Sequence, residues 1–582
     1  MTRGSVPDKN DRRSWRSILA GVLVGATTAA IPAGVGHGVA RPRADAAAPA
    51  AVVLTGTSFP ANFGIDVASD PVGLQAALWS PIIGFDDKLA PYGALAARVP
   101  TLANGDARVI GGGLRVTVHL KPALRWSDGS PLTANDVLFG LKLNLDPAIG
   151  NSFGLDEIAH IAAPDAHTVV LTFGDTYGAY LAYAMPPALP RAYFQRKYRN
   201  ADIHALALAY RSDPYDSPSD VFSGPYRVAS VAPGQRLTLD PNPSYTAPSG
   251  AVGSGSQPEL RYVVLSEDES ALARDLRSSQ AGVDVALGLS PATLPELSGL
   301  AGGLRARVLP SLSVEHLELN MATPALRDIH VRQALQYAID KRAFVRALFP
   351  AAVGASAPVA TSLIPAVSPY HDSSIPVSFY DPARARALLS AAGYVTTPNG
   401  SGRRLTLTLV TIRDLTRQRE ADLLTKSLAA VGVRVVERLT SPSPSDQGGF
   451  YAPYDRGGVL ATRNFDLALF DLRLGPDPAT AASLFDPARI PDAISRGILR
   501  RNYTGINVDE LAMLPEAAQA SLDMPSRRLG YAKLQHKVNE LLPYIVLYDR
   551  PQIVVVDGHV HNVAPAPQDG GALWNSWQYT RS

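Results

Sequence analysis

The chain contains no cysteine among its 582 residues. This absence excludes disulfide bonds, cysteine-based metal sites and thiol catalysis. No Gly-Lys-Ser or Gly-Lys-Thr segment follows a glycine pair either, which argues against a phosphate-binding loop. A chain of this length is too long for one hydrophobic core, so we expect two or three domains.

Neither sign of charge dominates the chain. Seven basic and three acidic side chains lie within residues 1–46, so the remainder holds 47 Lys and Arg against 49 Asp and Glu. A nearly neutral protein lacks the electrostatic footprint of a nucleic-acid binder. We therefore expect no nucleic-acid partner.

The N-terminal segment has the layout of an export signal. Three arginines precede an uncharged stretch at residues 18–40: Arg12, Arg13 and Arg16. Residues 44–46, Ala-Asp-Ala, fit a signal cleavage site. An uncleaved anchor is the alternative because the stretch is long enough to span a bilayer, although Pro32 interrupts it. We expect residues 1–46 to be cleaved, with the route, Sec or twin-arginine, left open.

The stretch at residues 120–136, LKPALRWSDGSPLTAND, predicts a strand, a turn and a helix start. Asp128 and Gly129 supply the turn, because Gly takes positive φ and Asp bonds its own backbone. Thr133 and Asp136 have the spacing of a capping box. The whole string closely resembles the signature of family 5 extracellular solute-binding proteins, the peptide and nickel receptors of ABC importers.

Six further segments resemble that family, and they occur in the family's order along the chain. They lie at residues 223–245, 280–285, 319–340, 380–394, 465–478 and 543–551. Each is a weak signal alone, whereas the ordered set from about residue 50 onward is specific. The chain departs from many members of the family in one respect, because it has no N-terminal cysteine for a lipid anchor.

The resemblance implies an α/β fold of the two-lobed periplasmic-binding-protein type (type II, in the large family 5 form). Residues 51–310 would form lobe 1, with an extra subdomain at about 100–220. Residues 311–539 would form lobe 2, and residues 540–582 would return to lobe 1. Such a chain crosses between the lobes twice, and the two crossings would make a hinge.

Local patterns predict several elements of the second lobe. A strand at residues 405–410, a helix to about residue 430 and a strand at 433–437 have the order of a βαβ unit. Asp381 followed by Pro382 is typical of a helix start. Residues 527–542 are expected to form the last helix.

The resemblance implies a binding protein rather than an enzyme. It would capture oligopeptides or dipeptides between the lobes as a periplasmic monomer without a cofactor, and deliver them to the permease subunits of an ABC transporter. A non-peptide ligand such as an opine, a sugar or a metal chelate is the main alternative. A membrane-anchored sensor and a secreted serine hydrolase are the rivals from other classes.

Two end-charge contacts are implied by dipeptide-binding relatives. There, an Arg after a strand of the second lobe takes the ligand carboxylate, and Arg413 occupies about that place. An Asp ahead of an Asp-Pro pair takes the amine, but this chain has Leu474 at that position. Asp471 is the candidate substitute, and Arg473 adds a positive charge beside it.

Other residues have a weaker claim to ligand binding. Ser58 and Phe59 follow the first strand, a segment that touches ligand backbone in the family. Three residues in the motifs are explained by turns and packing alone: Trp126, Asp128 and Tyr226.

Two patterns suggest other chemistry. His559 and His561 alternate on an expected strand and would share one face, but without a third ligand we predict no metal site. Residues 150–154, GNSFG, match the nucleophile-elbow string around Ser152. The helix end expected before it is the wrong context, because an elbow follows a buried strand.

Overall fold

A computed structural model describes residues 51–582 apart from residues 61–62, 65–72, 150–152, 200, 213–216, 218–219, 249–256, 279–281, 350–357, 398–400, 494–499 and 569–570. Ala51–Ser582 form one compact unit. The expected export signal and Ser152 lie outside the described residues. Within the described part of the chain, no helix has both the length and the apolar content needed to cross a membrane.

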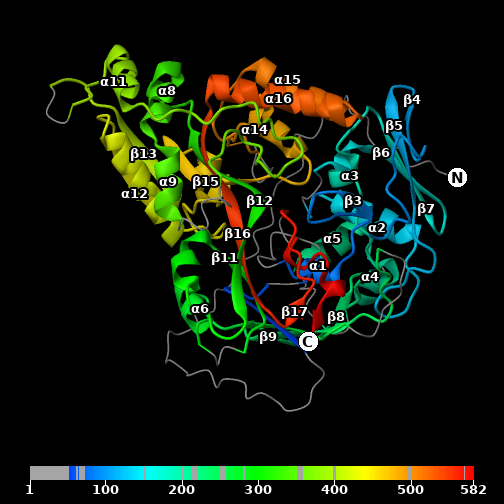
Figure 1. Cartoon of the computed structure of the whole chain (residues 1–582). Coiled ribbons are helices and arrows are strands. Elements are labelled where there is room, and N and C mark those ends of the chain that lie inside the picture. Colours follow the sequence, from blue (N-terminus) through cyan, green and yellow to red (C-terminus); the bar gives the residue numbers. More distant parts are fainter. Residues whose placement is uncertain are drawn as a thin grey trace. The chain divides into compact units, whose positions relative to one another are not determined.

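A mixed ten-stranded sheet organises the unit (Figure 1). In spatial order its strands are β14 (Arg434–Thr440), β13 (Thr406–Ile412), β15 (Leu467–Arg473), β12 (Leu304–Leu319), β16 (Tyr544–Asp557), β11 (Val285–Leu289), β1 (Val52–Gly56), β10 (Leu260–Val264), β9 (Arg236–Pro241) and β8 (Tyr226–Ala232). Parallel pairs join β14 to β13 and β13 to β15 at one end, and β11 to β1 and β1 to β10 at the other.

Two long antiparallel strands, β12 and β16, connect the two halves of this sheet (Figure 1). Residues 304–309 pair with residues 552–557 beside β11, and residues 313–318 pair with residues 544–550 beside β15. The register shifts between Leu309 and Ser313. Pro310 and Pro551 lie at this break, where a residue without an N–H interrupts the ladder least.

Alternation along β16 explains how helices cover this half of the sheet. Ile545 and Leu547 join the core packed by α8, α9, α11 and α12, whereas Tyr544 and Val546 join the core packed by α14, α15 and α16. In Figure 1 these two groups of helices lie in separate places beside the sheet. Their bounds are α8 (Ile329–Ala338), α9 (Lys341–Leu348), α11 (Pro382–Ala391), α12 (Leu415–Ala429), α14 (Ala482–Phe485), α15 (Asp509–Ala520) and α16 (Met524–Leu541).

A separate four-stranded sheet lies within residues 107–173. Its order is β4 (Ala107–Ile110), β5 (Gly113–His119), β7 (Thr168–Phe173) and β6 (Ile158–Asp165). The helices of this region are α2 (Ala134–Asn144), α3 (Tyr180–Tyr183), α4 (Arg191–Lys197) and α5 (Ile203–Ser212), and α2 packs against β6, β7, α4 and α5. The shorter elements elsewhere include α1 (Gln75–Leu78), β2 (Ile83–Phe85), β3 (Pro91–Gly93), α6 (Glu269–Asp275), α7 (Pro324–Arg327), α13 (Val459–Thr462), β17 (Val560–His561) and β18 (Thr580–Arg581).

Several local predictions are confirmed. The Thr133 N–H donates to Asp136 Oδ2 at 2.8 Å, so the capping box starts α2. The Asp381 carboxylate accepts from the Arg384 N–H and starts α11. The predicted βαβ unit is β13, α12 and β14. One prediction is wrong: His559 lies in a turn and not on a strand with His561, because the chain reverses at Gly558.

Candidate functional site

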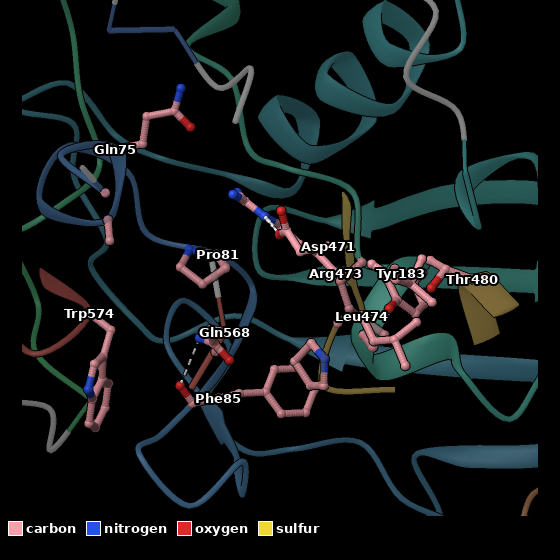
Figure 2. Close-up of a pocket in the computed structure, with 18 of the residues that line it drawn as sticks. Gln75, Pro81, Phe85, Tyr183, Asp471, Arg473, Leu474, Thr480, Gln568 and Trp574 are labelled. Carbon is pink, nitrogen blue, oxygen red and sulfur yellow. Dashed lines mark hydrogen bonds and ion pairs between the residues drawn. The ribbon is translucent and has the colours of Figure 1, made fainter. Parts of the chain in front are cut away.

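A cavity of about 1140 Å³ lies among the described residues, between strands β12, β15 and β16 of the second half of the sheet and segments that follow β1 of the first half. One wall follows β1 and comprises α1, β2 and β3, with residues 182–187 beside them. The opposite wall comes from β12, the end of β15 and residues 474–476. Figure 2 shows Asp471 and Arg473 on one side and Gln75 and Trp574 across from them.

The wall that follows β1 carries several aromatic side chains. Trp574 lies with its ring 5.6 Å from that of Tyr92, and both line the cavity with Trp79. The indole N–H of Trp79 donates to the Phe63 carbonyl at 2.7 Å, which fixes the orientation of the ring. This wall therefore offers flat apolar surface to a ligand, with polar groups supplied from elsewhere.

Asp471 lines the cavity, but arginines already occupy its carboxylate. Arg417 Nη2 donates to Oδ1 at 2.6 Å and Arg473 Nε donates to Oδ2 at 2.8 Å. Burial alone would raise the pKa of Asp471, yet the guanidinium groups of Arg550, Arg473 and Arg417 together hold it well below its usual range. The carboxylate is thus ionised and paired before any ligand amine arrives.

A buried ionic network continues behind Asp471. Glu315 lies opposite Asp471 in the pairing of β12 with β15, and it forms ion pairs with Arg417 and, at 3.0 Å, with Arg550. Glu420 from α12 lies 3.1 Å from Arg417. Burial and the Glu315 carboxylate raise the pKa of Glu420 above its usual range. The network links β12, β15, β16 and α12 at the floor of the cavity.

Two arginines line the cavity on the side of the second half. The Arg473 side chain lines the cavity and is 60% exposed. Arg501 is partly buried close to Tyr183 and Tyr503, whose rings also line the cavity. Two guanidinium groups on one wall are suited to a carboxylate or another anion.

The structure brings only two of the five predicted ligand-binding residues to this cavity. Among the described residues, its lining includes Asp471 and Arg473 but not Arg413, Ser58 or Phe59. Arg413 is exposed, and its backbone N–H donates to the Thr440 carbonyl at 2.8 Å.

Ser58 and Phe59 are engaged by Tyr262. The Tyr262 hydroxyl donates to the Ser58 carbonyl at 2.6 Å, and the Phe59 ring lies 6.3 Å from the Tyr262 ring. Ligand contacts by Arg413, Ser58 and Phe59 stay predictions.

The residues interpreted as structural have structural partners. Trp126 and Tyr226 are almost fully buried in the core, and Asp128 accepts from the Ser130 N–H within its turn. Asp477 of the Asp-Pro pair forms an ion pair of 2.6 Å with Arg527 and lies away from the lining.

The histidines near the C-terminus have separate partners. His559 contacts Asp557 and His561 contacts Ser582. In the described residues, no group of three or more His, Asp or Glu is arranged to hold a metal ion.

Sequence reasoning missed most of the polar residues of the cavity lining, among them Arg501, His316, Glu318 and Tyr544. The signal was present in β12, because a histidine and a glutamate two residues apart share one face of a strand. Nothing in the sequence indicates that this face is buried, since it depends on β15 and β16 lying on either side.

Comparisons with known proteins agree with this architecture. A Brucella ovis protein named as an ABC transporter peptide-binding protein is 25% identical over 525 residues, which cover 88% of this chain and 89% of that protein.

Two solved structures share the fold at low identity. The oligopeptide-binding protein of Thermus thermophilus, complexed with a pentapeptide, has a TM-score of 0.68 at 20% identity, covering 91% of this chain and 96% of its own. NikZ from Campylobacter jejuni, in complex with Ni(L-His), has a TM-score of 0.72 at 18% identity, covering 91% and 99%.

The expected two-lobed α/β fold is therefore confirmed. The family described as bacterial extracellular solute-binding proteins, family 5 Middle, matches residues 97–495. That match spans more than half of the chain, so the resemblance in its motifs is confirmed as well. The chain belongs to family 5 of the bacterial extracellular solute-binding proteins, the substrate-binding proteins of ABC transporters.

Proposed function

We propose that this chain captures short peptides in the cavity between the two halves of its large sheet and delivers them to the permease of an ABC importer. The observation that carries the proposal is the cavity itself, because segments that follow β1 form one wall and the second half of the sheet forms the other, while β12 and β16 run continuously through both halves. A ligand that contacts both walls favours the closed arrangement by its differential affinity.

The size and chemistry of the cavity support a peptide. Its volume of about 1140 Å³ exceeds the range of roughly 300–1,000 Å³ that is usual for small-molecule pockets. Aromatic rings on one wall could hold varied side chains, and Arg473 with Arg501 could hold the C-terminal carboxylate. The peptide-binding name of the Brucella relative and the pentapeptide bound by the Thermus protein also support this ligand class.

The role of Asp471 in this proposal differs from that implied by the relatives. Since Arg417 and Arg473 occupy both carboxylate oxygens, Asp471 holds Arg473 toward the ligand carboxylate instead of taking the amine itself. Asp471 and Arg473 then act as a pair, with Asp471 as the positioning residue.

The lobe boundaries are part of the proposal. Lobe 1 would be residues 51–310 with the C-terminal return, and lobe 2 residues 311–539. The break of register at Leu309 and Ser313, with Pro310 and Pro551 beside it, is where we expect the hinge. We also propose that the chain is exported to the periplasm, is cleaved after residue 46 and acts there as an unlipidated monomer.

Calorimetry of the purified chain tests the ligand class. We expect tri- to pentapeptides to bind, and amidation of the peptide C-terminus to weaken binding about tenfold, as for loss of a charge-assisted hydrogen bond. Arg473→Ala should remove this difference between free and amidated peptides, while Arg434→Ala, an exposed arginine of β14, should preserve it.

The alternative ligand is a non-peptide solute such as a metal chelate, which the Ni(L-His) complex of the Campylobacter protein supports. Binding of nickel–histidine, an opine or a sugar, with no response to any peptide, would replace the peptide by that solute and leave the family assignment intact.

A further inference from the structure

Three polar side chains meet at the inner end of the cavity, and we call them the inner polar pocket: His316, Glu318 and Tyr544. His316 and Glu318 alternate on β12 and therefore point to the same face. Tyr544 lies directly opposite Glu318 in the pairing of β12 with β16. All three side chains face the cavity although they are almost fully buried, with exposures of 1%, 2% and 3%.

Each member of the inner polar pocket has a polar atom without a partner. His316 Nε2 lies 3.5 Å from Glu318 Oε2, a long hydrogen bond between two of its members. His316 Nδ1, Glu318 Oε1 and the Tyr544 hydroxyl are buried and make no hydrogen bond. Buried polar atoms almost always have a hydrogen-bond partner. Three unpaired polar atoms close together in a cavity wall therefore indicate that a ligand group forms hydrogen bonds with them.

The orphaned atoms are mostly acceptors. A carboxylate accepts only, and a histidine that donates from Nε2 accepts at Nδ1, while a tyrosine hydroxyl can do either. The complementary ligand group therefore carries several N–H donors. A carboxylate or phosphate would meet the Glu318 charge instead and is disfavoured.

The protein does not neutralise Glu318 fully by itself. Burial raises the pKa of Glu318, although contacts with His316, the Thr504 backbone and the charge of Arg463 oppose this shift. Arg463 is already engaged, since its Nη2 donates to Asn320 Oδ1 at 2.6 Å and its Nε to the Tyr503 carbonyl at 2.9 Å. A cation supplied by the ligand would offset the free-energy cost of burying this carboxylate.

Aromatic rings surround the inner polar pocket. The Phe470 and Tyr544 rings lie 4.5 and 5.3 Å from the His316 ring. Phe485 lies 5.9 Å from Tyr544, and Tyr503 lies 6.5 Å from Phe470. Ring faces attract cations, whereas they add nothing specific for neutral amides. The hydrogen-bond acceptors, the Glu318 carboxylate and the aromatic rings together favour a positively charged ligand group.

We propose that the inner polar pocket binds a cationic head group of the ligand, a primary ammonium or a guanidinium. If the ligand is a peptide, which this step takes from the proposed function, the head group is a lysine or arginine side chain or the N-terminal amine. Arg473, at the end of β15 in the same lining, would then face an anionic part of the same ligand.

Matched peptides test this directly on the unmodified chain. Calorimetry would compare Ala-Lys-Ala and Ala-Arg-Ala with Ala-Met-Ala, which has a side chain of similar length without charge, and with Ala-Glu-Ala. Butylamine and butylguanidinium are the non-peptide probes. We expect Lys or Arg at the second position to bind about tenfold or more tightly than Met, from one charge-assisted contact, and Glu to bind most weakly.

Glu318→Gln keeps the shape of the side chain and removes its charge. We expect this variant to lose the preference for Lys over Met while binding Ala-Met-Ala as before. Glu267→Gln, at an exposed position outside the lining, should keep the preference. If Glu318→Gln fails to fold, as judged by circular dichroism, the affinities of the unmodified chain for Ala-Lys-Ala and Ala-Met-Ala still test the cation site.

The outcomes separate this proposal from the peptide function. Peptide binding without preference for Lys or Arg, or a preference that survives in Glu318→Gln, would overturn the cation site and leave peptide capture standing. Binding of butylamine or butylguanidinium without any peptide binding would overturn peptide capture and support the cation site. Failure of every cationic probe to bind would overturn the cation site.

Discussion

Arg417 Nη2 lies 2.6 Å from Asp471 Oδ1, so the acid at the cavity floor is held by an arginine that does not itself line the cavity. Burial alone would lower the pKa of Arg417, but the carboxylates of Glu315, Glu420 and Asp471 raise it well above its usual range. Arg417 therefore stays charged at any practical pH and joins three acids from three elements.

We expect Arg417→Met to destabilise the protein by about 3–5 kcal/mol, because it leaves buried carboxylates without their cation. Thermal and urea denaturation would measure the loss. Arg413→Ala, an exposed arginine four residues earlier, should change stability by less than about 0.5 kcal/mol. Equal effects of the two substitutions would contradict the central place of Arg417 in the network.

Gly178 marks a second connection between distant segments, since its N–H donates to the Gln519 carbonyl at 2.5 Å and its carbonyl accepts from Arg527 Nη1 at 3.0 Å. A Cβ on Gly178 would lie 2.0 Å from the Ser521 carbonyl oxygen. We expect Gly178→Ala to cost about 1–3 kcal/mol of stability by overpacking.

Gly174→Ala is the matched control for that substitution, because a Cβ there meets nothing within 4 Å. Its melting temperature should equal that of the unmodified chain or rise slightly. An unchanged melting temperature for Gly178→Ala would mean that the contact with residues 519–521 is dispensable.

Local chemistry was enough to predict much of the fold from the sequence. The capping box of Thr133 and Asp136 and the start of α11 at Asp381 depend on residues within one helical turn. The strand β13 was predicted because apolar residues alternate with polar ones at residues 405–410. The order of the family motifs then supplied the topology, which no local pattern contains.

The cavity was predicted less well for a physical reason. Arg413 and Arg417 both follow β13, and Arg417 becomes buried because it pairs with Glu315 and Asp471, which come from distant parts of the chain, as well as with Glu420 on its own helix. His559 was placed on a strand by alternation alone, although Gly558 next to it reverses the chain. Long-range partners, not local propensities, therefore determine which arginine is buried, whereas the error at His559 came from a local turn.

Lys341 is 5% exposed at the start of α9, and burial lowers the pKa of its ammonium to about 7. A lysine whose folded pKa lies below its unfolded value of about 10.4 contributes most stability when neutral, and that stability is lost as pH falls from about 10 to about 7. Lys341→Met should therefore be more stable than the unmodified chain at pH 6, by about 2–4 kcal/mol, with no gain at pH 10.

Urea denaturation at pH 6, 8 and 10 would measure this difference. Arg342→Met, at the exposed neighbouring position, removes a positive charge without burial and should give a difference that does not vary with pH. A gain for Lys341→Met that persists at pH 10 would point to improved apolar packing instead of relief of a buried charge.

Glu318 gives the proposed cation site its own dependence on pH. Because burial raises the pKa of Glu318, the carboxylate takes up a proton at a higher pH than the ordinary value of about 4.3. Protonation removes the attraction for a cation, so affinity for Ala-Lys-Ala should fall as pH is lowered through that raised value.

The arginine and the tyrosines around Glu318 do not change charge over this range. Arg463 stays cationic, and burial raises the pKa values of Tyr544 and Tyr503 above that of a free phenol. Calorimetric affinities between pH 5 and 8 would test the dependence on Glu318. In Glu318→Gln the preference for Ala-Lys-Ala over Ala-Met-Ala should be small at every pH, whereas a pH-dependent preference that persists there would contradict the assignment to Glu318.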